Sequence, residues 1–143
     1  MASANLELVR GIRGAWDRGE FAAVDWAHPQ LEFVIADGPT PGTWTGLAGM
    51  AAGWREFLGG WEDWRATASD YRELDGSRVL VLVELSGRSR ASGLDIARSG
   101  KGQGANVFHL REGKVTRFVL YLERDRALTD LGLAAEADAA TPG

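Results

Sequence analysis

The segment from Arg78 to Leu85, Arg-Val-Leu-Val-Leu-Val-Glu-Leu, constrains the fold more than any other part of the sequence. Its aliphatic and β-branched residues are typical of a strand, and successive side chains of a strand point to opposite faces. One face carries Val79, Val81, Val83 and Leu85, and the other carries Leu80 and Leu82. Because both faces are apolar, the strand must be covered on both sides, which predicts a layered domain built around a sheet.

Neighbouring segments predict the other strands. Trp64–Leu74 ends at the turn signal Asp75-Gly76, and a long strand ending at Arg111 is joined to Lys114–Glu123 by the turn Glu112-Gly113. An earlier strand is predicted over Leu31–Ala36. These strands form an antiparallel series, with the Gly- and Pro-rich residues 38–42 as a loop.

Helical periodicity dominates the N-terminal half. The sequence predicts a helix from a cap at Ser3 or Asn5 to about Arg18, ended by Gly19, a short helix over Glu20–Trp26, and a third over Leu47–Trp61. A further short helix is predicted over Arg124–Leu133. Helices followed by a run of strands indicate an α+β domain, and the Ala-rich residues 134–143 are predicted to be a disordered tail.

Composition excludes several classes of protein. The 143 residues suit a single domain, and the absence of cysteine excludes disulfides and thiolate chemistry. Two histidines far apart make a histidine metal site unexpected, and no cofactor is predicted. A net charge of −4 argues against nucleic-acid binding, and no apolar run approaches the roughly 20 residues of a membrane helix. With no signal peptide visible, the expected location is the cytoplasm.

Asp37 is the first candidate for chemistry. It follows the apolar strand Leu31–Ala36 and precedes the Gly-Pro loop and Trp44. A carboxylate beside an apolar, aromatic region has its pKa raised toward neutrality by desolvation, as proton transfer requires. The alternative is that Asp37 starts a turn by bonding nearby backbone, which is the commoner role of such a residue.

The two apolar faces of the strands also bear on assembly. If helices cover only one face of the sheet, the other face needs a partner. A homodimer through the outer face would supply one, although scattered exposed apolar residues are also normal.

Several segments, taken in order, resemble one family. They are Ala15-Trp-Asp-Arg-Gly-Glu-Phe21, Gly42-Thr-Trp-Thr-Gly46, Arg78-Val-Leu-Val-Leu-Val, Val107-Phe-His-Leu-Arg-Glu-Gly-Lys-Val115 and Tyr121-Leu-Glu-Arg-Asp-Arg-Ala-Leu128. Together they resemble a SnoaL-like domain of the nuclear transport factor 2-like superfamily, which includes ketosteroid isomerase and polyketide cyclases. The resemblance implies one domain over residues 1–133. It also implies a cone-shaped α+β barrel, in which a strongly curved antiparallel sheet wraps round three helices of the N-terminal half and encloses a pocket.

The isomerase pattern of this superfamily implies two catalytic positions. Its base aspartate stands nine positions before the glycine that opens the long helix, which is where Asp37 stands relative to Gly46. Its second acid falls on Asn106, whose amide can hydrogen-bond an enolate. The tyrosine of the first helix falls near Ile12, which has no donor, so this chain departs from a true ketosteroid isomerase there.

The resemblance also implies a pocket for an apolar small molecule. The substrate-binding side chains expected to line it are Trp16, Trp44, Trp54, Phe57, Val81, Val83, Phe108 and Phe118; for each aromatic residue, plain core packing is the alternative. Two functions follow. The first is a cofactor-independent isomerase or cyclase in which Asp37 abstracts a proton from a polyketide- or steroid-like carbonyl compound. The second is a non-catalytic binding or dimerisation module of the same fold.

Overall fold

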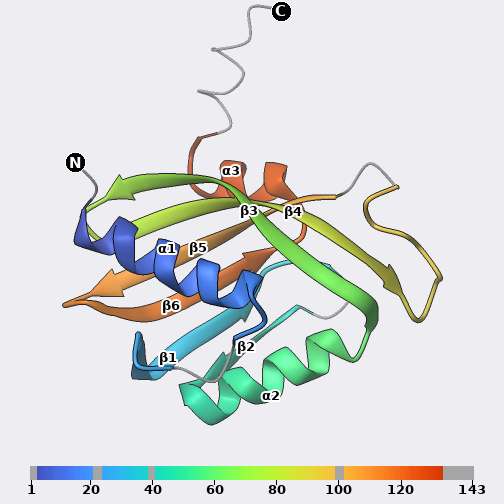
Figure 1. Cartoon of the computed structure of the whole chain (residues 1–143), viewed down its shortest axis with the longest axis horizontal. Helices are drawn as coiled ribbons and strands as arrows, with labels where there is room; N and C mark the ends of the chain where they lie inside the picture. Colours follow the sequence, from blue (N-terminus) through green and yellow to red (C-terminus); the bar gives the residue numbers. More distant parts are fainter. Residues whose placement is uncertain (1–2, 21–23, 39–40, 99–101, 134–143) are drawn as a thin grey trace, which may run out of the picture.

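The computed structural model describes residues 3–20, 24–38, 41–98 and 102–133, and they form one six-stranded sheet with helices on both sides (Figure 1). The helices are α1 (Ala4–Asp17), α2 (Gly46–Leu58) and α3 (Arg124–Asp130). The strands are β1 (Ala27–Ile35), β2 (Gly42–Thr45), β3 (Trp61–Asp75), β4 (Arg78–Ser89), β5 (Gln103–Arg111) and β6 (Lys114–Tyr121). The α+β class is therefore confirmed.

The sheet has the strand order β2-β1-β6-β5-β4-β3 and is strongly curved but not closed. Every neighbouring pair is antiparallel except β1 and β6, which run parallel through pairs such as Phe33 with Phe118. The prediction of a purely antiparallel sheet was wrong at this pair. Strands β1 and β6 are neighbours in the sheet but far apart in the chain, because β3, β4 and β5 lie between them in the sequence.

The concave face of the sheet holds the main core. Val79, Val81, Val83 and Leu85 of β4 lie there with α1, α2 and the inward residues of β1, β5 and β6. Helix α1 begins at Ser3, whose Oγ accepts the Leu6 amide at 3.0 Å, and Gly19 follows its end with a φ of 79°. The predicted cap and the glycine stop are both confirmed.

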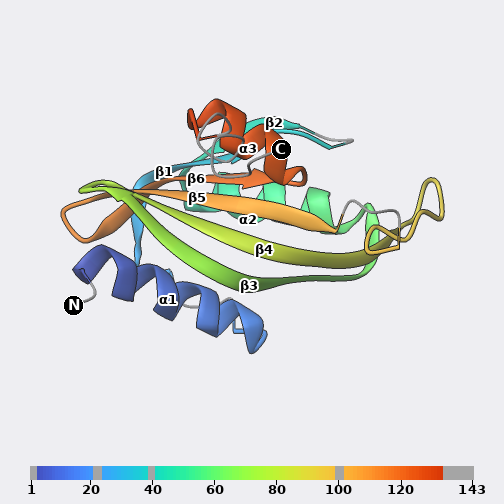
Figure 2. The ribbon, with the colours of Figure 1, turned by 90° about the horizontal axis from the view of Figure 1, so that it is seen from above.

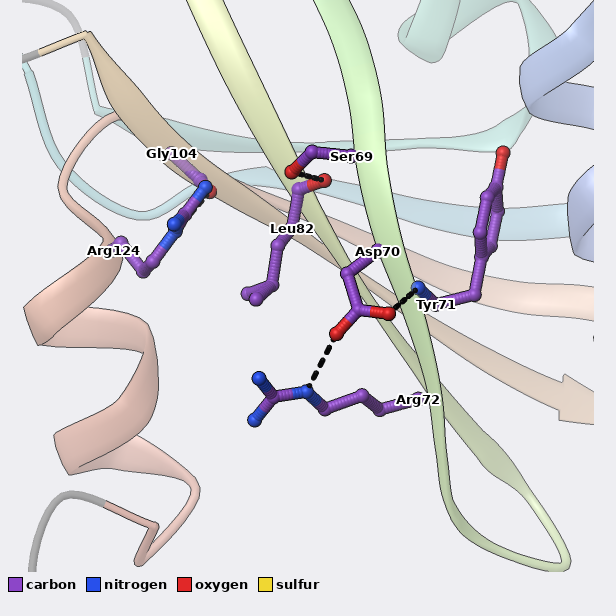
Figure 3. Close-up of polar contacts among 7 residues, drawn as sticks. All are labelled: Ser69, Asp70, Tyr71, Arg72, Leu82, Gly104 and Arg124. Atoms are coloured by element: carbon purple, nitrogen blue, oxygen red, sulfur yellow. Dashed lines mark hydrogen bonds and ion pairs between the residues drawn. The ribbon is translucent and has the colours of Figure 1, made fainter. Parts of the chain in front are cut away.

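The outer face is covered in part by α3, which lies on the opposite side of the sheet from α1 (Figure 2). Arg124 fastens the start of this helix, because its Nε donates to the Gly104 carbonyl at 3.3 Å and its Nη2 to the Val83 carbonyl at 3.0 Å. Figure 3 shows Arg124 reaching toward Gly104 on this side of the sheet, where Asp70 and Arg72 of β3 also lie, while Tyr71 turns the other way. The third helix is thus a C-terminal one, and the described residues of the N-terminal half form two helices rather than the three predicted.

Two local predictions were wrong. No helix forms in the described part of Glu20–Trp26, where Asp25 and Trp26 form a turn and Ala27 opens β1; residues 21–23 lie outside the described residues. The second concerns the segment before the long helix. The predicted loop, residues 38–42, overlaps β2 at Gly42, and β2 itself, which pairs with β1 through Phe33 and Trp44, was not predicted. The predicted tail, residues 134–143, also lies outside the described residues.

Candidate functional site

Asn106 lies on β5 and faces the concave side of the sheet. Its neighbours across the sheet are Val81 on β4 and Leu120 on β6, both in the main core. The residue is 1% exposed, and its Oδ1 has no hydrogen-bond partner among the described residues. An unpartnered buried polar atom costs about 1–3 kcal/mol, so the fold tolerates an amide here without bonding its oxygen.

Asp37 lies just beyond the end of β1, where the parallel pairing with β6 stops. Its Oδ1 accepts the Leu122 amide at 2.6 Å and its Oδ2 accepts the Glu123 amide at 3.2 Å. The side chain bonds backbone, as the turn alternative supposed, but the backbone is that of the distant connection between β6 and α3. The carboxylate thus continues the β1–β6 ladder and positions the start of α3.

Burial sets the protonation behaviour of Asp37. The residue is 5% exposed, and desolvation raises the pKa of its carboxyl above the ordinary value, while the hydrogen bonds from Leu122 and Glu123 oppose that shift. Glu123 raises this pKa further through like charge, and Arg126 lowers it. A carboxyl with a raised pKa is a better proton acceptor in its ionised form.

Asp37 and Asn106 occupy different rows of the sheet. Ile35, Leu120 and Asn106 stand abreast on β1, β6 and β5, and Asp37 is two residues beyond Ile35. The backbones of Asp37 and Asn106 are therefore two strands apart across the sheet and two residues apart along it, a distance of about 12 Å. A single side chain cannot bridge that gap, but a polycyclic molecule could contact both groups.

Aromatic rings fill the concave face. Trp16 on α1 has its ring centroid 5.4 Å from that of Phe118 and 6.1 Å from that of Phe108. Trp54 lies 5.7 Å from Phe57 and 5.4 Å from Phe33, which stacks on Phe118 at 5.6 Å. Val81 and Val83 are fully buried beneath this layer. The eight side chains expected to line a pocket therefore lie in one cluster, in which the rings contact each other.

Trp44 lies on β2, at the edge of the sheet. Its ring is 5.7 Å from Phe33 and rests against Gly53 of α2, where an added Cβ would come within 2.6 Å of it. It is half-buried and joins β2 to α2. Its position is that of a core residue, so a ligand would contact it only at the margin of the aromatic cluster.

Two of the hollows on the described part of the chain lie elsewhere. One, of about 510 Å³, runs along α1 and has Trp16 and Trp26 in its wall. The other, of about 440 Å³, lies on the outer face between β6 and α3. Neither includes Asp37 or Asn106 in its lining. Trp16 contributes to both the first hollow and the ring cluster, so it separates that hollow from the interior.

Sequence reasoning missed a buried cation. Arg13 on α1 is 3% exposed; its Nη2 donates to the Ala66 carbonyl at 2.6 Å and pairs with Asp17 at 3.1 Å. Burial lowers its pKa, and Asp17 and the nearby Tyr71 oppose that shift. A signal was available, because Arg13 falls between Ile12 and Trp16 on the apolar stripe of the helix.

Among the described residues, no group of three or more His, Asp or Glu side chains is placed to hold a metal ion. No helix in those ranges is long and apolar enough to cross a membrane. Asp37 and Asn106 stay the candidate residues for chemistry, and the aromatic cluster stays the candidate binding surface.

The curved sheet, the helices on its concave face and the one parallel pair define a protein of the nuclear transport factor 2-like fold. The chain belongs to the SnoaL-like domain family, whose sequence profile matches residues 9–118. The predicted family is therefore confirmed.

Solved structures agree with the fold. A nuclear transport factor 2-like protein of unknown function from Burkholderia pseudomallei is similar with a TM-score of 0.70 and 18% identity, over 90% of this chain and 97% of that one. A protein from Mesorhizobium loti described as a candidate SnoaL-like polyketide cyclase gives 0.65 and 12%, over 80% and 96%. TerC, crystallised with polyporic acid, gives 0.65 and 20%, over 90% and 98%. Among curated proteins, no match is found. At these identities the structures establish the fold alone.

Proposed function

We propose that the concave face binds an apolar, carbonyl-bearing small molecule of polyketide or steroid type, and that the protein acts on it as a cofactor-independent isomerase or cyclase. The observation that carries the proposal is the buried, unpartnered amide oxygen of Asn106. A hydroxyl or enol of a bound molecule would satisfy that oxygen, and the same amide turned over would offer its NH₂ to an enolate.

The surroundings of Asn106 support a flat, apolar guest. Aromatic rings and valines make up the concave face, and such side chains hold ligands by area burial and ring contacts. A guest of this kind has to take the place of rings now in contact with each other. Trp54 is only half-buried and Trp16 borders the hollow on α1, so these two rings are the ones that would move. The co-crystallised ligand of TerC, named polyporic acid, and the cyclase description of the Mesorhizobium loti protein support the same class of molecule.

Asp37 would act as the base. Its carboxylate takes a proton from the carbon next to the carbonyl, and the electron pair of that C–H bond moves to form an enolate. Asn106 donates a hydrogen bond to the enolate oxygen. Return of the proton from Asp37 to another carbon gives an isomer. Attack of the enolate carbon on a second carbonyl of the same molecule instead closes a ring, and the proton then goes to the new alkoxide.

One observation favours the second function, a binding module without chemistry. Both carboxylate oxygens of Asp37 already accept backbone amides, which gives this residue a sufficient structural role. In a binding module Asn106 would fix the guest, and Asp37 would only position the connection to α3. The homodimer through the outer face and the cytoplasmic location both stay predictions.

The test separates turnover from binding. Asp37→Asn removes the base but retains an acceptor for one of the two amides. We expect turnover to fall by at least about 100-fold, which is the usual effect of removing a general base. The affinity for the same compound should change by less than about threefold. Turnover is followed by mass spectrometry of a polyketide or steroid ketone incubated with the protein, and affinity by quenching of tryptophan fluorescence.

Asp125→Asn, on an exposed position in the first turn of α3, is the matched control and should leave both quantities unchanged. A parallel fall of binding and turnover in Asp37→Asn would argue against a base and for a structural role. Tight binding by the unmodified protein with no altered product after long incubation would establish the binding module.

A further inference from the structure

The hollow on the outer face has a distinctive distribution of charge. Its volume is about 440 Å³, and its floor contains Val107, Val119 and Val34, which stand abreast on β5, β6 and β1. One side of this floor is bordered by Arg78, His109 and Arg117. The opposite side is bordered by Tyr121 and by α3. The hollow therefore combines a flat apolar floor with a basic margin.

The basic margin is a row across three neighbouring strands. Arg78 pairs with His109 between β4 and β5, and His109 pairs with Arg117 between β5 and β6. Side chains in such positions have Cβ atoms about 4.5–5.5 Å apart, and like charges placed there destabilise a sheet. The row therefore places the N–H donors of two guanidinium groups and an imidazole side by side on adjacent strands, where one anion could contact all three.

The acidic partners only partly neutralise this row. Arg78 pairs with Asp75 at 2.9 Å and Arg117 with Glu32 at 3.3 Å, and both acids lie at the outer ends of the row. His109, in the middle, is half-buried, and its pKa is lowered by burial and by the charges of Arg117 and Arg78, against the smaller opposing effects of Asp75 and Glu32. The lowered pKa favours the neutral imidazole, and each arginine has an acidic partner, so the row offers an anion N–H donors rather than a large net charge.

The far side of the hollow is less basic. Arg126 lines it, but Asp130 lies 4.0 Å from that guanidinium and also accepts the Tyr121 hydroxyl at 2.9 Å. An anionic group is therefore better placed at the row of Arg78, His109 and Arg117, with an apolar body over the valines.

We propose that this hollow binds a small organic anion, a flat apolar molecule ending in a carboxylate or phosphate group that contacts Arg78, His109 and Arg117. The volume lies within the range of about 300–1,000 Å³ that small-molecule sites occupy. The site is separate from the concave face and does not rest on the function proposed above.

A second copy of the chain is the main competing occupant. Helix α3 and the residues after it already cover the neighbouring rows of this face, so little of it is open to a second copy. A small anion needs only the hollow, whereas a stable dimer needs roughly 800 Å² from each copy.

The test uses 2-naphthoate as the probe, with 2-naphthamide as its neutral counterpart, and measures affinity by titration calorimetry. We expect 2-naphthoate to bind at least about tenfold more tightly than the amide, since a hydrogen bond to a charged group contributes that much. Arg117→Gln and Arg78→Gln should each weaken the binding of 2-naphthoate by about tenfold. Arg65→Gln, an exposed arginine of β3 outside the hollow, changes the net charge equally and should have no effect.

The two histidines of the chain provide a second readout in the unmodified protein. Nuclear magnetic resonance of the imidazole carbons should show the pKa of His109 rising when 2-naphthoate is bound, because a nearby negative charge favours the imidazolium. The resonances of His28, which lies away from the hollow, should not move. The other charged or titratable groups facing His109 or lining the hollow are Arg78, Arg117, Glu32, Asp75, Tyr121, Arg126 and Asp130.

Three results would overturn the proposal. They are equal binding of the acid and the amide, equal weakening by Arg65→Gln and Arg117→Gln, and no response of His109 to millimolar probe. Sedimentation of the same samples identifies the competing occupant: a mass that falls in Arg117→Gln, with no probe binding, would assign the face to a second copy.

Discussion

At the scale of single residues, the buried side chains of Asp37 and Asn106 differ in their hydrogen bonding. Asp37 is buried and fully engaged, since each carboxylate oxygen accepts a backbone amide. Asn106 is buried, and its Oδ1 has no partner within the described residues. The first arrangement stabilises a connection between elements, and the second leaves an acceptor without a hydrogen bond among the described residues.

This contrast predicts an unusual effect of Asn106→Leu. Leucine has a similar shape and removes the unpartnered oxygen, so the free energy of unfolding of the ligand-free protein should stay the same or rise by up to about 1 kcal/mol. Denaturation in urea measures this change. Stabilisation of the protein by an added polyketide or steroid ketone should be lost at the same time.

Asn5→Leu is the matched control. Asn5 donates to the Gly76 carbonyl at 2.9 Å, so its replacement should cost about 0.5–1.5 kcal/mol. A loss of more than about 2 kcal/mol in Asn106→Leu would mean that the amide is a structural group of the core.

At the scale of elements, β2 and α2 are held together by one close contact. The Trp44 ring fits against Gly53, where a Cβ would lie 2.6 Å from the ring carbons. Because Trp44 also packs on Phe33 of β1, it links the edge of the sheet to the helix. The glycine is there for space, and its φ is that of an ordinary helix.

Two Gly→Ala substitutions test this account. Gly53→Ala should destabilise the protein by about 1–3 kcal/mol through overpacking, despite the better helix propensity of alanine. Gly11→Ala, on α1 with nothing within 4 Å of the added Cβ, should instead stabilise it by about 0.5–1 kcal/mol. Thermal unfolding of both variants gives the comparison, and equal shifts of the same sign would refute the packing argument.

At the scale of the whole molecule, the buried carboxyl of Asp37 makes stability depend on pH. Its folded pKa is raised above the unfolded value of about 4. Its contribution to stability is therefore fully present below about pH 4 and is lost as the pH rises through the folded pKa.

Comparison with Asp37→Asn isolates this effect. The pKa of Asp70 is lowered, and that of Asp75 is lowered to about 2, so both groups make the folded protein less stable as the pH falls. These two effects are present in both proteins and cancel in the comparison. Measured by urea denaturation between pH 7 and pH 4, the wild-type protein should gain stability relative to Asp37→Asn as the pH falls. An unchanged difference would mean that Asp37 has the same pKa folded and unfolded.

Local patterns were enough to predict most elements, because their signals depend on near neighbours in the chain. The alternation in β4, the glycine turn before β6, the Ser3 cap and the stripe of α1 all belong to this kind. The failures were short segments. Residues 24–26 and β2 are decided by what they pack against, and β2 exists because β1 offers an edge to pair with.

The sequence by itself determined the α+β class, the family and the inward direction of the residues on β4, since alternation and the order of elements survive in any packing. Only the tertiary structure decided that β1 pairs in parallel with β6, that α3 covers the outer face, and that Arg78, His109 and Arg117 stand in one row. It also brought Asp37 to the amides of residues 122 and 123, which are 85 and 86 positions away in the sequence. Such contacts depend on the register of strands that are distant in the chain, and no local pattern specifies that register.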